Sequence, residues 1–212
     1  MKLQNQSQQS KLALMGMFCA IILILAFTPL GFIQLPFIRA TIIHIPVIIG
    51  CLLLGPKHGA MLGFLFGLVS LINNTMAPVL SSFAFSPLVP VPGLERGSLA
   101  ALIVCFVPRI LVGIIPWFVY RGIKKLCGEK SEVASLAVAG VAGSLTNTLL
   151  VMHFIFIFFR EAYAVVQEIA MEAVYGFIMT IIVVNGIPEA IVAGILTAAI
   201  CMALKVVQRR TG

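Results

Sequence analysis

The sequence predicts an all-α integral membrane protein, a bundle of six transmembrane helices with both termini in the cytoplasm. Of its 212 residues, 61% are hydrophobic and only 10% are charged, an apolar share that no water-soluble domain of this size needs. Apolar runs long enough to cross a bilayer recur along the chain. Basic residues gather in one alternate set of the connections between these runs, which is typical of cytoplasmic loops.

Six apolar segments are candidate spans within a single membrane domain of residues 1–212. They cover residues 12–33, 38–54, 58–75, 98–120, 132–158 and 176–204. The first follows a polar lead without a small-residue cleavage site, so it is predicted to be a transmembrane helix and not a cleaved signal. The second and third are joined by the tight turn "GPKHG". The fifth and sixth are long enough to tilt or to extend beyond the bilayer.

The basic residues give the orientation. Six spans place both termini on one side of the membrane, and the loops of that side hold ten basic residues: Lys2, Lys11, Lys57, Arg121, Lys124, Lys125, Lys130, Lys205, Arg209 and Arg210. The opposite loops hold three, Arg39, Arg96 and Arg160. This bias predicts cytoplasmic N- and C-termini in a multi-pass protein of the cell membrane.

Two outer segments have unusual composition. Residues 76–97, "MAPVLSSFAFSPLVPVPGLERG", are too apolar for a solvated linker and too rich in proline for an ordinary helix. A loop of this length is typical of a lid over a site, and the alternative is a loop lying on the membrane surface. Residues 160–175 are expected to form a short amphipathic helix or an extension of the fifth span.

Polar residues at membrane depth are the candidate site, because such residues are functional candidates by default. Helical rise places them in the middle and outer half of the bilayer, and they are Arg109, Asn147, Asn185, Glu189, His44 and Asn74. Each has a structural alternative. Arg109 and Glu189 could form an internal ion pair, His44 could cap a backbone carbonyl, and the two mid-membrane amides could join helices by hydrogen bonds.

Convergence favours a pocket over these separate roles. Several polar groups from different helices share one depth, beside kinks expected at Pro108 and Pro188. The pocket would open to the outside under residues 76–97. The guanidinium of Arg109 matches a carboxylate by bidentate geometry, so we expect it to bind an anionic group of a substrate.

Several functions are excluded or unsupported. The sequence has no HExxH, GxSxG or phosphate-loop motif and no aspartate, so we expect no catalytic residue, no cofactor and no metal site. Its five cysteines are scattered through apolar segments, as small hydrophobic residues would be. The net charge of +7 is not clustered on a soluble module, so nucleic acid is not an expected partner and membrane lipid is.

Four segments carry a family resemblance: "TIIHIPVIIGCLLLGPKHGAMLGFLFGLVSLINNT", "SFAFSPL", "PRILVG" and "GSLTNTLLVM". In this order they resemble the substrate-binding S components of energy-coupling factor (ECF) vitamin transporters, above all the branch that includes the pantothenate-specific S component. The resemblance covers most of residues 12–204. It implies six helices, cytoplasmic termini, an outward-facing pocket under loops, and no ATP hydrolysis by the chain itself.

The resemblance also implies partners and residue roles. The partners are a transmembrane T component and two ATPase subunits, on which an S component docks through small residues of its first helix. Gly16 and Ala20 match that pattern, although the family's version uses alanine only. Pantothenate would place its carboxylate on Arg109 and its hydroxyls and amide on the other candidates. The carboxylate of Glu189 does not fit this scheme easily, because an unpaired negative charge near an anionic ligand lowers its affinity.

Three alternatives stay open at this point: another vitamin such as cobalamin, a structural or assembly role with an Arg109–Glu189 ion pair, and a small channel or carrier that acts alone.

Overall fold

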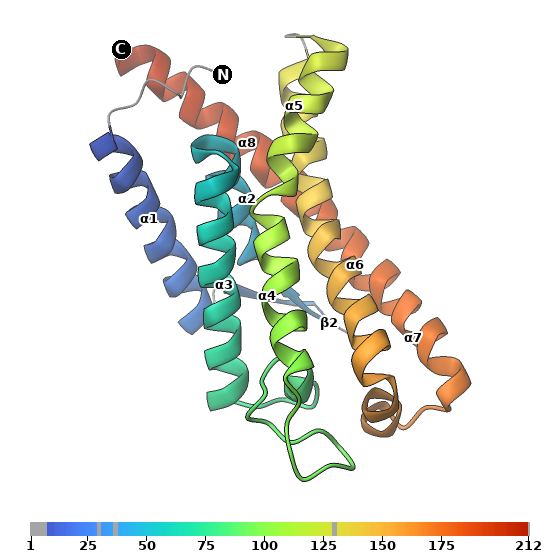
Figure 1. The fold of residues 1–212 in the computed structure, drawn as a ribbon. Coiled ribbons are helices and arrows are strands. Elements are labelled where there is room, and N and C mark those ends of the chain that lie inside the picture. The colour runs from blue at the N-terminus through green and yellow to red at the C-terminus, as the bar shows by residue number, and fades with distance from the viewer. Residues whose placement is uncertain (1–7, 29–30, 36–37, 129–130, 212) are drawn as a thin grey trace.

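The computed structural model describes residues 8–28, 31–35, 38–128 and 131–211, with the backbone alone for 32–35, 38–40 and 207–211. The described chain is a bundle of helices with one small β-hairpin (Figure 1). In chain order the elements are α1 (Gln8–Phe27), β1 (Phe32–Leu35), β2 (Ile38–Thr41), α2 (His44–Leu54), α3 (Pro56–Met76), η3 (Ser82–Ala84), α4 (Ala100–Val112), α5 (Ile115–Cys127), α6 (Glu132–Gln167), η5 (Met171–Ala173), α7 (Val174–Ile181), η6 (Ile182–Gly186) and α8 (Ile187–Thr211).

Within the described ranges, five helical segments are long and apolar enough to cross a membrane: Gln8–Phe27, Pro56–Met76, Ala100–Cys127, Glu132–Gln167 and Met171–Val206. The sixth predicted span corresponds to α2, which is apolar but has only 11 residues. A bilayer core needs about 20 helical residues, so α2 alone is too short to cross it. These helices support the membrane-protein class. The described chain has five such segments, or six if α2 is counted as a span.

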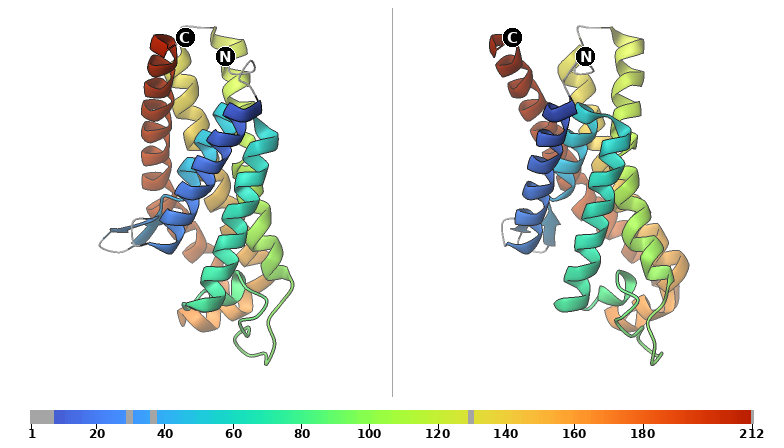
Figure 2. Two further views of the ribbon diagram at one scale, coloured as in Figure 1. Left: turned by 90° about the vertical axis from the view of Figure 1, so that its left-hand side faces the viewer. Right: turned by 60° about the vertical axis from the view of Figure 1, so that its left-hand side comes forward.

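The prediction that residues 38–54 form one helix was wrong at its beginning. Residues 38–41 form strand β2, which pairs antiparallel with β1 so that Phe32 lies opposite Thr41. The segment "IRATII" is rich in β-branched residues, which favour strands over helices. Figure 2 shows the hairpin projecting to the side of the bundle.

Proline and glycine divide two of the predicted spans. The span 98–120 contains two helices, because α4 ends at Val112 and α5 begins at Ile115 with Pro116 in its first turn. Proline lacks the N–H that would continue the helix. The span 176–204 contains α7 and α8 joined by the π-helical turn η6, directly before Pro188.

Helix α6 is longer than the predicted span 132–158. It continues to Gln167 across a kink at Phe159, where the backbone leaves helical geometry (φ −135°, ψ 17°). The first half of the segment 160–175 is therefore an extension of this helix, one of the two expected alternatives, and its second half forms η5 and the beginning of α7. The extension ends at Glu168, whose left-handed backbone stops the helix.

Helices α3 and α4 touch backbone to backbone along much of their length. A Cβ atom added to Gly63 would overlap the carbonyl group of Arg109, and Gly59 and Gly113 stand in the same relation to each other. Glycine is the residue that permits such an approach of membrane helices. The crossing fixes the position of Arg109 relative to α3.

Two apolar clusters fill the bundle. One joins α1, α2 and α3 with the beginning of α6 and the last helix, and includes Ile22, Ile48 and Leu62. The other lies where the segment 76–97 covers the bundle, and includes Phe83, Val104 and Ile155. The loop is therefore a folded, packed cap on the helices.

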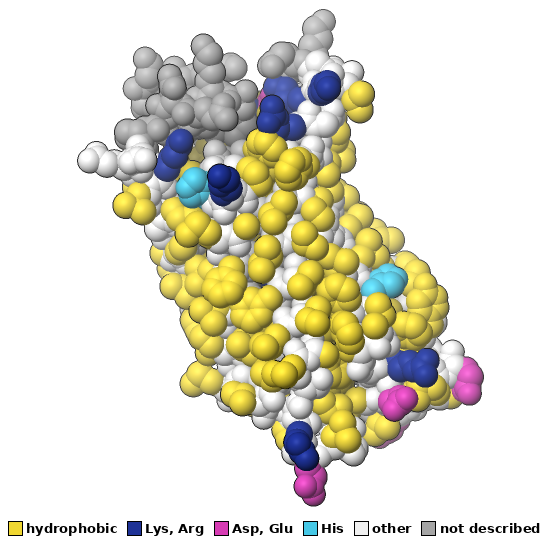
Figure 3. All heavy atoms as spheres, viewed as in Figure 1, with side chains coloured by type: hydrophobic (Ala, Val, Ile, Leu, Met, Phe, Trp, Pro, Cys, Tyr) yellow, Lys and Arg dark blue, Asp and Glu magenta, His cyan; other side chains and the backbone are white. Residues whose placement is uncertain are grey.

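Helix α1 begins and α8 ends at the same end of the bundle, which is also the end where α2 turns into α3 (Figure 1). The segment 76–97 lies at the opposite end. In Figure 3 lysine and arginine side chains gather toward the first end, an apolar surface covers the waist, and the described acidic side chains are most visible at the other end. Lys2 and Lys130, used to predict orientation, lie outside the described residues, as do the side chains of Arg39, Arg209 and Arg210.

Candidate functional site

Arg109 is buried in α4, with 7% of its surface exposed. Its Nη1 donates a hydrogen bond of 2.7 Å to the backbone carbonyl of Val104. In a regular helix that carbonyl would accept from the N–H of residue 108, but residue 108 is proline. The arginine side chain points back along the helix and satisfies the carbonyl that the proline leaves free.

Two aromatic rings flank the Arg109 guanidinium. Its Cζ lies 5.6 Å from the ring centroid of Phe66 on α3 and 5.0 Å from that of Phe85 in the segment 76–97. These distances fit cation–π contacts. The cap loop therefore touches the central candidate residue directly, which the sequence could not reveal because Phe85 is one of 15 phenylalanines.

The Arg109–Glu189 ion pair, one of the alternatives above, is not formed. Both ion pairs found among the described residues belong to Glu132, with Lys124 and Lys205. Glu189 instead accepts a hydrogen bond of 3.0 Å from the backbone N–H of Thr41 at the end of the hairpin. The Nε of Arg109 is buried without a hydrogen-bond partner, so the cation is only partly satisfied by the protein.

Other candidates also carry buried polar atoms without partners. Neither ring nitrogen of His44 has a partner at hydrogen-bond distance and angle, although the Thr41 backbone lies close to the ring, and this residue is 2% exposed at the beginning of α2. The Oδ1 of Asn147 on α6 is likewise unpartnered. One turn earlier Ser144 has the same property, and sequence reasoning did not single it out. Buried polar groups in proteins normally have partners, so this set is suited to a polar ligand.

Asn185 lies in the π-helical turn η6 and is half-buried. The neighbouring Gly186 packs against Thr148 of α6, next to Asn147 in the chain. Helices α2 and α6 each contact α4 and α8. The helices that carry His44 and Asn147 thus each contact both the helix of Arg109 and the helix of Glu189.

Asn74 takes a different position from the other candidates. Its Nδ2 donates to the carbonyl of Ser70, and its Oδ1 accepts from the hydroxyl of Ser82 in the cap loop at 2.8 Å. The adjacent Thr75 hydroxyl bonds that of Ser86 at 2.7 Å. This end of α3 anchors the loop, so the amide of Asn74 is already engaged.

Gly16 and Ala20 lie exposed on α1. A Cβ atom at Gly16 would meet nothing within 4 Å, so no described part of the chain covers this position. Small exposed residues four apart leave a shallow surface on which another helix can approach closely.

Comparison with known proteins finds a family and relatives that match nearly the whole chain. The family model for the ECF transporter substrate-specific component matches residues 10–201. The chain is 38% identical over 202 residues to the pantothenic acid transporter PanT of Lactococcus lactis subsp. cremoris, covering 94% of this chain and 96% of that protein.

A second relative is the pantothenate transporter PanT of Leuconostoc mesenteroides subsp. mesenteroides. It is 28% identical over 218 residues, covering 98% of each chain. The resemblance drawn from the four sequence segments is confirmed by the family match and by these relatives. The chain belongs to the family of ECF transporter substrate-specific components.

Proposed function

We propose that this chain captures pantothenate outside the cell and delivers it through an ECF transporter, with Arg109 binding the pantothenate carboxylate. One observation carries the proposal: a buried arginine that has no described carboxylate partner and an unpartnered Nε. A cation is costly to bury alone, and an anionic ligand would balance it. Both relatives described above are named as pantothenate transporters, which supports this vitamin.

The geometry of Arg109 suggests how the carboxylate sits. Nη1 is held by the Val104 carbonyl, so the edge formed by Nε and Nη2 remains for a bidentate pair. Phe66 and Phe85 lie beside the guanidinium and keep water from it. The pair would therefore form in a dry, low-dielectric place, where it is strong.

The remaining candidates fit the uncharged part of pantothenate, which has two hydroxyls and one amide. His44, Asn147 and Asn185 would bond these groups, because two of the three carry unpartnered buried atoms. Glu189, held by the Thr41 N–H, would accept from a hydroxyl. Asn74 would act through the cap loop that it anchors.

Delivery would require partners. As the family's role implies, the chain would dock on a T component associated with two ATPase subunits, and the uncovered surface at Gly16 and Ala20 of α1 would be the contact. The basic bias of one set of loops supports cytoplasmic N- and C-termini. ATP hydrolysis would then take place in the partners.

The test compares pantothenate with panthenol, in which an alcohol replaces the carboxylate, by titration calorimetry on the purified chain. We expect tight pantothenate binding and at least about 30-fold weaker panthenol binding, because a buried charge-assisted pair contributes roughly 2–5 kcal/mol. Arg109→Ala should lose pantothenate binding and the discrimination between the two ligands. Arg160→Ala, which removes an exposed cation, is the matched control.

Other outcomes would redirect the proposal. Equal binding of pantothenate and panthenol by the unaltered chain would mean that Arg109 does not bind the pantothenate carboxylate. Tight binding of another vitamin, such as cobalamin, would keep the family role and change the substrate. If no vitamin in a panel binds, a structural role is favoured. Uptake by vesicles that contain this chain alone would favour an independent carrier.

A further inference from the structure

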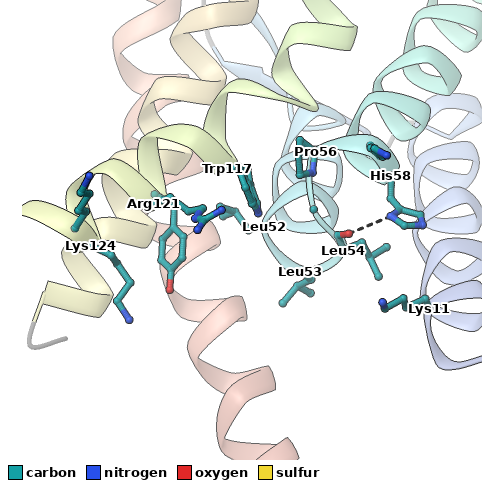
Figure 4. Close-up of a pocket in the computed structure, with 13 residues that line it drawn as sticks. Lys11, Leu52, Leu53, Leu54, Pro56, His58, Trp117, Arg121 and Lys124 are labelled. Carbon is teal, nitrogen blue, oxygen red and sulfur yellow. Dashed lines mark hydrogen bonds between the residues drawn. The ribbon is translucent and has the colours of Figure 1, made fainter. Parts of the chain in front are cut away.

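A cleft of about 650 Å³ lies at the end of the bundle where α2 turns into α3 (Figure 4). This is the opposite end of α3 from the cap loop and the candidate site. The residues that line it come from α1, α2, α3 and α5: Lys11, Leu52, Leu53, Leu54, Gly55, Pro56, Lys57, His58, Trp117, Tyr120, Arg121, Lys124 and Lys125. The cleft thus combines a leucine-rich wall from α2 with a basic rim.

Most of the positive charge on this rim is not balanced within the described chain. Lys124 is bound to Glu132 at 2.5 Å, so its charge is already compensated. No described carboxylate lies within 4 Å of Lys11, Lys57 or Arg121. The N-terminal end of α3, where Pro56 takes the first position, adds the positive end of a helix dipole.

Aromatic residues mark this cleft as a membrane boundary. The guanidinium of Arg121 lies 4.6 Å from the ring centroid of Trp117, and Tyr120 bonds Glu132 at 2.6 Å. Tryptophan and tyrosine are enriched at the two membrane interfaces. The chain therefore presents unbalanced cations at the depth where lipid headgroups lie, directly beside apolar side chains.

We propose that this cleft binds an anionic phospholipid, with the phosphate at the basic rim that includes Lys11, Lys57 and Arg121 and the beginning of an acyl chain against the leucines of α2. The charge selects a phosphate-bearing group, and the leucine wall selects one with an apolar body. Basic pockets between transmembrane helices bind lipid headgroups in this manner. The proposal is independent of the substrate and of the candidate site around Arg109.

The sequence supplies a reporter, because Trp117 is its one tryptophan and lines the cleft. The experiment measures quenching of its fluorescence by brominated phosphatidylglycerol or brominated phosphatidylcholine in reconstituted vesicles. The variant Lys11→Gln/Lys57→Gln removes two rim charges and leaves Arg121 on the indole. The control Arg96→Gln/Arg160→Gln removes the same charge from exposed positions elsewhere.

We expect the unaltered chain to prefer phosphatidylglycerol over phosphatidylcholine by about tenfold or more, and raised salt to weaken that preference. Each basic residue near a membrane surface contributes about fivefold. The rim variant should therefore lose most of the preference, while the control should keep it.

Three results would overturn the proposal. An unaltered chain that quenches equally with both lipids has no anionic site here, and the cleft would then suit an acidic surface of a partner protein. Equal losses in the rim and control variants would show only a general charge effect. Competition by millimolar glycerol phosphate or inorganic phosphate would assign the cleft to a water-soluble anion. The comparison of the two lipids and the competition by soluble phosphates use the unaltered chain, so both tests stand even if the rim variant fails to fold.

Discussion

Pro108 and Arg109 act as a pair within helix α4. Pro108 lacks the N–H that would donate to the Val104 carbonyl, and the Nη1 of Arg109 donates to that carbonyl in its place. A proline inside a membrane helix is tolerated where the freed carbonyl finds another donor. Arg109 is therefore a structural residue as well as a candidate ligand for an anion.

This pairing predicts coupling between the two positions. Pro108→Ala restores the N–H that bonds Val104, so the hydrogen bond from Arg109 is no longer needed there. Arg109→Met should then destabilise the Pro108→Ala background less than the original chain, by about 0.5–1.5 kcal/mol. Unfolding of the four proteins in denaturant measures this coupling, and strictly additive effects would contradict it.

Residue types at membrane depth could be found from the sequence, but their partners could not. Arg109, His44 and Asn147 stand out because polar groups are rare in apolar spans. That Glu189 bonds the hairpin and not Arg109 depends on residues 148 positions apart. The contact between Phe85 and Arg109 joins a loop to a helix, and no periodicity in the sequence encodes it.

Among the elements, the crossing of α3 and α4 positions Arg109 of the candidate site. Gly63 lies against the carbonyl of Arg109 so closely that a Cβ atom would overlap it. Gly63→Ala should push α4 away from α3, lowering stability by roughly 1–3 kcal/mol and weakening ligand binding with it.

The matched control for this crossing is Gly176→Ala. Gly176 lies in helix α7, and an added Cβ would meet nothing within 4 Å. Alanine is a better helix former than glycine by about 1 kcal/mol, so this variant should be at least as stable as the original. Thermal unfolding of both variants, with calorimetry of ligand binding, would show whether the close approach matters.

The cap loop is the second element whose behaviour can be predicted. It is anchored by Ser82 and Ser86 on the end of α3, and Phe85 lies 5.0 Å from the Arg109 Cζ. Phe85→Leu should remove the cation–π contact and speed pantothenate dissociation about threefold to tenfold. Leu88→Ala, at an exposed loop position, should leave the rate unchanged; equal rates in all three proteins would argue against a lid.

The long apolar helices were predicted well from hydropathy. The short interruptions of these helices, which depend on local backbone geometry, were not. The apolar segments around α1, α3 and α6 follow from composition and length. The hairpin at residues 32–41 and the break at Gly113 interrupt apolar stretches in which hydropathy does not change. Such interruptions depend on pairing, proline and glycine, and a search for 20-residue runs merges them into spans.

For the whole molecule, the two ends of the bundle carry different tasks. The cap loop lies at one end of the bundle (Figure 1), and the cleft with the basic rim lies at the other, where α2 turns into α3. Helix α1 runs along the side of the bundle with large apolar residues exposed, including Leu12, Ile24 and Phe27. None of the candidate site residues lies on α1, so the proposed binding and the proposed docking can be altered separately.

That separation gives the prediction that tests the proposed role in full. Gly16→Leu and Ala20→Leu fill an uncovered surface of α1 and contact no candidate site residue. Both should therefore bind pantothenate with unchanged affinity in calorimetry. Uptake into vesicles that also contain the T component and ATPases should fall at least about tenfold, because two bulky side chains prevent close helix approach.

The control for this surface is Ile24→Leu, an exposed position on the same helix that stays bulky and apolar. It should retain both binding and uptake. Loss of pantothenate affinity in the Gly16 or Ala20 variants would mean that α1 lines the pocket. Unchanged uptake in those variants would place the docking contact on another helix, since a surface that tolerates leucine at both small positions cannot be one that a partner approaches closely.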